Sequence, residues 1–140
     1  MTSATIDTAA PAKADAGIWT GRVLSTLAIL FFLMDGGMKI VPPPQVPETM
    51  ATLGWPTDLG TIRLLAALSL GSVLLYAWPR TALLGAVLLT AYLGGAIATH
   101  VRVGSPLFSH VLFGVYIGLI LWGGLWLRDP RLRALFPIMR

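Results

Sequence analysis

The chain of 140 residues contains no cysteine and has few charged residues. The absence of cysteine excludes disulfide exchange, cysteine-ligated iron–sulfur clusters and thiolate metal sites, so any redox role would need a partner or a bound cofactor. Charged residues make up 11% of the sequence and hydrophobic residues 56%, and the mean hydropathy is +0.78. A soluble fold could not bury so much apolar surface, and the composition therefore predicts an integral membrane protein.

The apolar residues are gathered in long stretches. A helix that spans a bilayer needs about 20 largely apolar residues. Four stretches meet this requirement, namely Ile18–Val41, Leu59–Trp78, Thr81–Thr99 and Leu107–Leu127. We therefore predict an all-α membrane fold, a four-transmembrane-helix bundle that forms one domain over residues 18–140. Residues 1–17 are small and polar and lack the pattern of a cleavable signal peptide, so we expect a disordered tail there.

Positive charges predict how the bundle is oriented. One side of the predicted bundle collects seven basic residues and the other only three. Under the positive-inside rule this bias places both termini in the cytoplasm, in a multi-pass protein of the cell membrane. The first group is Lys13, Arg22, Arg80, Arg128, Arg131, Arg133 and Arg140, and the second is Lys39, Arg63 and Arg102. In a membrane protein these cations meet lipid phosphates, and we expect no nucleic acid partner.

The longest connection, residues 42–58, contains Pro47 followed by Glu48, a pattern that can open a short helix ending at Gly54. Val46, Met50 and Leu53 would share one face of that helix. Such a segment could cap the bundle or lie in the outer membrane interface. We favour the interface, because an amphipathic segment binds there readily.

Small residues predict where helices approach each other. Alanine, threonine or glycine recurs every four residues along the third span, and the fourth span contains a GxxxG pair. The residues concerned are Ala82, Ala86, Thr90, Gly94 and Ala98, followed by Gly114 and Gly118. Packing within one chain is the favoured interpretation, since four helices already supply partners. A homo-oligomer is the alternative.

Six ionisable residues from four helices are predicted to lie at one level, near the outer end of the bundle. They are Asp35, Lys39, Arg63, His100, Arg102 and His110. Asp35 precedes Lys39 by four residues on the same helical face, the favourable order for an ion pair. Under one interpretation these charges only orient the helices and reach lipid phosphates. Under the other they form a ligand or proton site, because an ionisable group at membrane depth is costly and usually functional.

The two histidines raise the question of a metal or haem. No carboxylate or cysteine close in sequence completes a ligand set, so we expect no metal and interpret His100 and His110 as hydrogen-bonding groups. The six residues carry a net positive charge even with both histidines neutral. A bound group is therefore expected to be anionic or rich in hydrogen-bond acceptors, such as a quinone headgroup, a sulfur oxyanion or a lipid headgroup.

Three segments resemble the DoxX-like family of small four-helix membrane proteins. They are MDGGMKIVPPP at 34–44, LYAWPRTALLGAVLLTAYLGGAIATHVRVGSPLFSH at 75–110 and LILWGGLWLRDPRLRALFP at 119–137. The broader group includes a membrane subunit of a thiosulfate:quinone oxidoreductase, so the resemblance implies a link to quinones or sulfur chemistry through a partner. Many relatives carry a glutamate in the second span where this chain has Ser69, and this difference weakens the transfer of any role of that glutamate.

We therefore expect a membrane subunit or binding module for a quinone or an anionic headgroup, without catalytic residues of its own. Its partners would be the lipid bilayer and a soluble or membrane oxidoreductase. The alternative function is a small-molecule transporter that acts as an oligomer. An independent membrane enzyme ranks third, because Asp35 and His100 are the only obvious acid–base pair.

Overall fold

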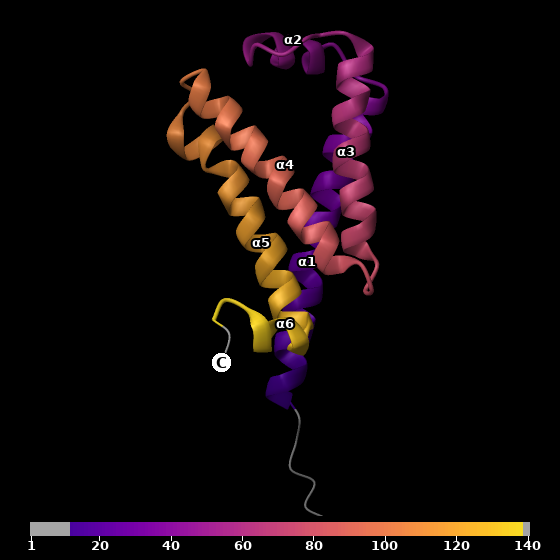
Figure 1. The fold of residues 1–140 in the computed structure, drawn as a ribbon, viewed down its shortest axis with the longest axis vertical. Coiled ribbons are helices and arrows are strands. Elements are labelled where there is room, and N and C mark those ends of the chain that lie inside the picture. The colour runs from indigo at the N-terminus through magenta and orange to yellow at the C-terminus, as the bar shows by residue number, and fades with distance from the viewer. Residues whose placement is uncertain (1–11, 139–140) are drawn as a thin grey trace, which may run out of the picture.

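The computed structural model describes residues 12–138, and this part of the chain is helical, with no strand. Figure 1 shows the helices in order. They are α1 (Ala12–Ile40), α2 (Gln45–Thr52), α3 (Leu59–Ala77), α4 (Ala82–Arg102), the short π-helical turn η1 (Leu107–Val111), α5 (Phe113–Arg128) and α6 (Pro130–Leu135).

Four helical segments are long and apolar enough to cross a membrane, which confirms the predicted four-span bundle. They are α1 from Ala16, α3, α4, and η1 together with α5. In the 18-residue apolar window of each span only 22% to 33% of the residues are buried, so much of the apolar surface faces outward, as a bilayer requires. Helix α1 begins at Ala12 rather than near Ile18. Residues 1–11 of the predicted tail lie outside the described residues.

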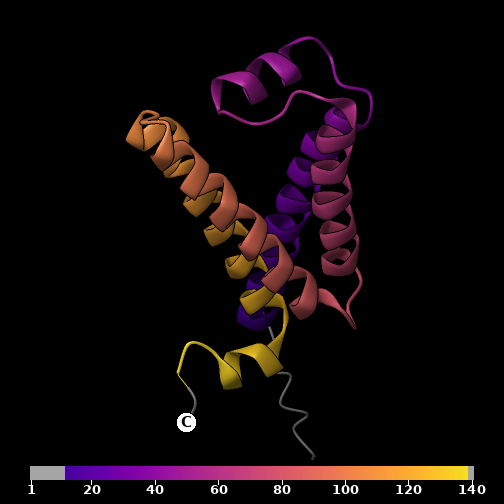
Figure 2. The same cartoon turned by 45° about the horizontal axis from the view of Figure 1, so that its top comes forward.

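The four spans form a ring in which each packs against two others. Helix α1 lies between α3 and α5, and α4 completes the ring between these two. Figures 1 and 2 show that the spans converge where α1 begins, at the α3–α4 turn and α6, which we call the closed end. At the other end α4 and α5 lean away from α1 and α3, and α2 lies across the top; we call this the open end.

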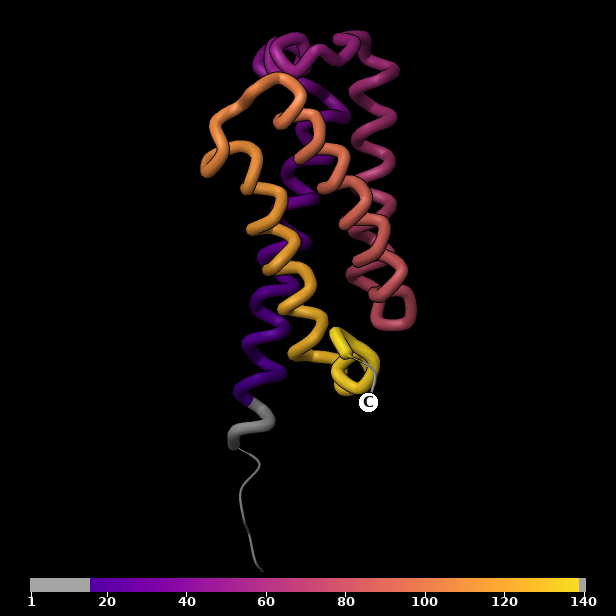
Figure 3. Tube along the Cα trace, turned by 60° about the vertical axis from the view of Figure 1, so that its left-hand side comes forward, coloured from indigo at the N-terminus to yellow at the C-terminus, as the bar shows by residue number. Residues whose placement is uncertain are grey.

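Glycine makes the convergence at the closed end possible. A Cβ atom on Gly124 would lie 2.7 Å from the backbone nitrogen of Ser25, and one on Gly21 would lie 2.8 Å from that of Arg128. Along this stretch α1 and α5 therefore touch backbone to backbone, and Figure 3 shows the two running side by side. Gly85 allows the same close approach of α4 to Tyr76 of α3.

The stripe of small residues on α4 changes surroundings along its length. Ala82 and Ala86 are buried at the closed end, whereas Gly94 and Ala98 are exposed, because α4 has by then leaned away from α1 and α3. Thr90 lies between these regions, and its hydroxyl accepts a hydrogen bond from the Trp122 indole at 2.8 Å. On α5, Gly114 and Gly118 both face α4, at Ile97 and Leu93.

Helix α2 caps the open end, which differs from the position in the outer interface that the sequence favoured (Figure 2). Met50 points inward and is only 6% exposed, and Val46 and Leu53 lie on the same inner face, as predicted. Gly54 has a φ of 71°, a left-handed conformation that turns the chain back after the helix. Because α4 and α5 lean away from α1 and α3, the open end has an apolar opening between the helices, and the inner face of α2 packs over it.

Candidate ligand cavity

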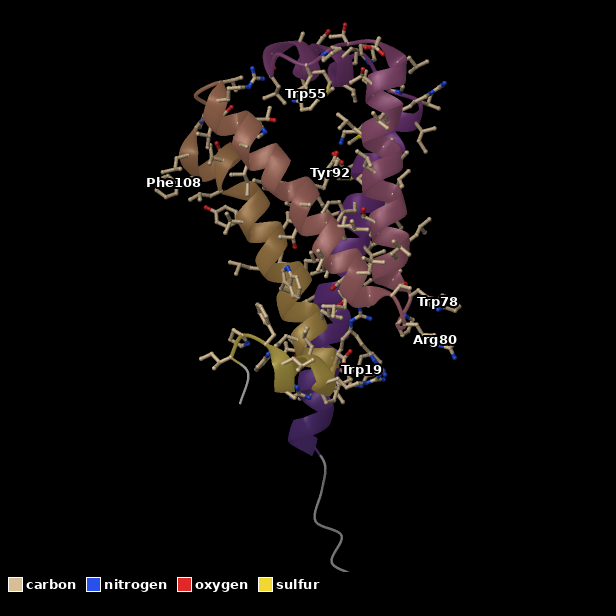
Figure 4. The ribbon with its side chains drawn as sticks, viewed as in Figure 1. Trp19, Trp55, Trp78, Arg80, Tyr92 and Phe108 are labelled. Carbon is tan, nitrogen blue, oxygen red and sulfur yellow. The ribbon has the colours of Figure 1, made fainter. Side chains whose placement is uncertain are left out.

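A cavity of about 730 Å³ lies at the open end, beneath α2. Helices α1 and α4 supply most of its walls, α2 and Trp55 cover it, and His110 and Phe113 border one side. Figure 4 shows Tyr92 pointing from α4 into this space and Trp55 lying under α2, whereas Phe108 points away from the bundle. A cavity of this size is large enough for a small organic molecule.

The α1 wall carries an ion pair between Lys39 and Asp35. Both side chains line the cavity and are mostly buried, at 15% exposed for Lys39 and 28% for Asp35. The Lys39 ammonium also lies 6.0 Å from the centre of the Tyr92 ring. Mutual neutralisation makes two charges tolerable at this depth, and each retains hydrogen-bonding capacity toward the cavity.

The wall opposite the ion pair carries the two histidines. His100 near the end of α4 and His110 in η1 lie edge to face, with 5.6 Å between ring centres. Each Nδ1 shares a hydrogen bond with a serine hydroxyl, at 2.9 Å to Ser105 for His100 and 2.7 Å to Ser109 for His110. These bonds fix the ring orientations and leave the Nε2 atoms as the remaining polar positions. Among residues 12–138 no group of three metal-binding side chains occurs.

The deeper surface of the cavity is apolar and aromatic. Phe31 of α1 and Phe113 of α5 meet edge to face at 5.4 Å, and Phe32 lies 6.5 Å from Tyr92. All four side chains line the cavity. The site is thus polar on two facing walls and apolar in its depth. This arrangement suits a molecule with a polar head and an apolar body.

Four of the six ionisable residues singled out from the sequence line the cavity, and the two arginines do not. The Arg63 Nε donates to the carbonyl of Ile40 at 3.0 Å, and an Arg102 guanidinium nitrogen donates to the carbonyl of Leu53 at 2.6 Å. Each arginine therefore caps the end of a helix, α1 in one case and α2 in the other. The Arg63 bond joins α3 to the end of α1, and the Arg102 bond attaches the end of α2 to α4.

The sequence had not pointed to the aromatic lining. Tyr92 precedes Thr99 by seven residues on α4, so helical periodicity places both on one face, and both line the cavity. That spacing was a usable signal. Met50 was predicted to share a helical face with Val46 and Leu53, although not to line a cavity. Trp55 carries no such signal, because it reaches the site only through the fold of the connection over the bundle.

Ser69 lies close to the site but does not line it. It is fully buried, and its hydroxyl donates to the carbonyl of Ala66 at 3.2 Å. The same hydroxyl oxygen would lie 3.0 Å from a Cβ atom on Gly36, the residue after Asp35. At the contact of α3 with α1 this chain therefore has a short side chain, Ser69, whose hydroxyl already has a hydrogen-bond partner.

The fold and cavity define a multi-pass, four-helix integral membrane protein with an amphipathic cavity at one end of the bundle. The model of the DoxX-like family matches residues 23–124, and the chain belongs to this family. The matched region contains Asp35, Lys39, His100 and His110, and the match confirms the resemblance seen in the sequence. No curated protein matches the chain, and no solved structure matches it.

Proposed function

We propose that this protein is a membrane binding module that holds a quinone-like molecule in the cavity at the open end. One observation carries the proposal: an apolar, aromatic cavity of about 730 Å³ with Asp35 and Lys39 on one wall and two histidines on the other. A quinone has acceptor oxygens on opposite sides of an apolar ring. Lys39 and a histidine N–H are donors suited to such oxygens.

The charge of the lining favours a neutral headgroup over an anionic one. Asp35 and Lys39 cancel, and the two arginines that made the predicted cluster cationic bind backbone carbonyls instead. With both histidines neutral the lining therefore has no formal net charge. Burial of an anion in such a site would be costly in free energy. Burial of a neutral group rich in hydrogen-bond acceptors would cost much less.

In this proposal the protein has no catalytic residues and serves as the membrane subunit of a partner oxidoreductase. The chain lacks cysteine, and its cavity would present the bound quinone within the membrane to the partner. Purification from native membranes in mild detergent tests this part. We expect a soluble or membrane oxidoreductase to be recovered with the protein. Substrate-dependent flux through proteoliposomes would support a transporter instead.

Quinone binding is tested by native mass spectrometry of the detergent-purified chain with a benzoquinone that bears an alkyl chain. Ala96 lines the cavity, whereas Ala98, two residues later on α4, is exposed and does not. Ala96→Phe should fill the site and abolish binding, and Ala98→Phe should bind like wild type. Asp35→Asn should weaken binding, because it leaves the charge of Lys39 without its neutralising carboxylate beside a largely apolar cavity. Equal binding by all four proteins would refute the cavity as the quinone site.

A further inference from the structure

A second cavity, of about 380 Å³, lies at the closed end, far along the bundle from the first. The α3–α4 turn and the start of α4 border it on one side, and α5 and α6 on the other. Its lining includes Arg80, Leu83, Asp129, Arg131, Leu132 and Leu135. None of these residues lines the cavity beneath α2.

The charged residues at this cavity are mainly cationic. Arg80 lies in the α3–α4 turn beside Trp78, and Arg131 lies in the first turn of α6. Within residues 12–138 neither guanidinium donates a hydrogen bond or forms an ion pair. Figure 4 shows the Arg80 side chain extending outward from the turn, so its flexible stem must turn toward α6 for both arginines to meet one anion at the cavity mouth. The one carboxylate, Asp129, already accepts a hydrogen bond from the backbone amide of Arg131 at 2.9 Å. It serves as the N-cap of α6.

The α6 wall of this cavity is fixed in place by packing on α5. Leu132 is buried, and the Phe136 ring stacks on Trp122 with 5.3 Å between ring centres. The Trp126 indole donates a hydrogen bond to the carbonyl of Phe136 at 3.0 Å. These contacts hold α6 against α5 and so fix the position of the backbone of Arg131 at the cavity.

The surroundings indicate a lipid rather than a free ion. The cavity is located where the spans end, the depth at which phospholipid headgroups lie. Leu83 is 50% exposed and Leu135 60% exposed, so two cavity-lining side chains offer apolar surface directly beside the arginines. Trp78, 66% exposed, is the kind of residue that lies at a membrane interface.

We propose that this cavity binds an anionic phospholipid, with the phosphate at Arg80 and Arg131 and the acyl region against Leu83 and Leu135. Guanidinium groups pair well with phosphate oxygens, and basic pockets between the ends of membrane helices are suited to anionic headgroups. The proposal is independent of the ligand held beneath α2.

The test is native mass spectrometry of the full chain, released from vesicles of equal phosphatidylglycerol and phosphatidylcholine. The ratio of the two retained lipids is compared for wild type, the double variant Arg80→Gln/Arg131→Gln and the double variant Arg22→Gln/Arg133→Gln. The last variant is a matched control. It removes the same charge from the same end, but Arg22 and Arg133 lie over the rings of Trp19 and Trp126 and line neither cavity.

We expect wild type and the control to retain phosphatidylglycerol preferentially, and each cavity arginine to contribute about fivefold to that preference. Three results would overturn the proposal: no preference in wild type, an equal loss in both double variants, or displacement of the lipid by millimolar inorganic phosphate. The second would indicate diffuse attraction by the basic end, and the third a site for the free anion. Unchanged thermal unfolding of both variants establishes that they are folded.

Discussion

The hydroxyl of Tyr76 donates a hydrogen bond of 2.7 Å to the backbone carbonyl of Leu121, and this bond joins α3 to α5 inside the bundle. Because the single phenolic proton is used there, the Ser25 hydroxyl on α1 is the donor in its own bond to the Tyr76 oxygen, at 3.0 Å. Three spans are thus connected at one fully buried side chain. The closed end is held together by polar as well as apolar contacts.

Replacement of Tyr76 by phenylalanine should lower the free energy of unfolding by about 1 kcal/mol, since it leaves the buried Ser25 hydroxyl without its partner. Tyr116→Phe is the matched control. Tyr116 is 42% exposed on α5, so its replacement by phenylalanine should leave the free energy of unfolding nearly unchanged. Thermal unfolding in detergent measures both. Equal stability of the two variants would show that the Tyr76 bonds contribute nothing.

Gly85→Ala should destabilise the bundle by about 1–3 kcal/mol, because its Cβ would lie 2.5 Å from the Cα of Tyr76. The obstacle is backbone, which cannot move aside as a flexible side chain can. Gly94→Ala, on the same helix, has no atom within 4 Å of the added Cβ and should leave stability nearly unchanged. If both substitutions were tolerated in thermal unfolding, the described contact between α3 and α4 would be incorrect.

Arg102→Gln should loosen the cap over the open end, because it removes the bond from the guanidinium to the Leu53 carbonyl at the end of α2. We expect amide hydrogen exchange within α2 to quicken by roughly fivefold, with exchange in α3 unchanged. Arg133→Gln, at the closed end, is the control. Exchange in α2 that is equally fast in wild type and Arg102→Gln would show that other contacts hold the cap.

The carboxylate of Asp58 should make stability depend on pH. Hydrogen bonds from the Thr61 backbone amide and hydroxyl, each 2.8 Å, hold the pKa of this carboxyl below its ordinary value of 3.8. A lowered pKa means that the charged cap stabilises the folded state above the ordinary value. That contribution is lost as the pH falls through the lowered pKa.

Asp58→Asn keeps a capping oxygen but cannot titrate, and so it serves as the reference for this effect. The wild-type protein should melt at a higher temperature than Asp58→Asn at neutral pH, and the difference should narrow at acidic pH. A difference that stays constant down to pH values below 3.8 would contradict the assignment.

The spans were predictable from the sequence because their length and apolar composition follow directly from bilayer thickness. The leaning of α4 and α5 was not. A repeat of small residues from Ala82 to Ala98 predicts close packing along a whole helix, yet only its first half is packed. Which part of such a repeat is buried depends on the crossing angle of the helices, and the spacing of residues does not determine that angle.

The polar part of the cavity was also predictable, because counting along each helix placed Asp35, Lys39 and both histidines at one level. Counting gives depth but not the direction in which a long side chain reaches. Arg63 and Arg102 lie at the same level and bend toward helix-end carbonyls instead. The aromatic lining depends on tertiary contacts such as that between Phe31 and Phe113.

The open end also bears on how the protein behaves outside its membrane. There a cavity of about 730 Å³ lies between α1 and α4, and the two helices meet only in part, as where Phe32 and Lys39 contact Tyr92. Whatever occupies that space becomes part of the contact between the two helices, and its binding free energy adds to the resistance of the fold to melting. The melting temperature measured after purification should therefore vary with the detergent and with any small molecule retained from the membrane, even when the polypeptide is unchanged.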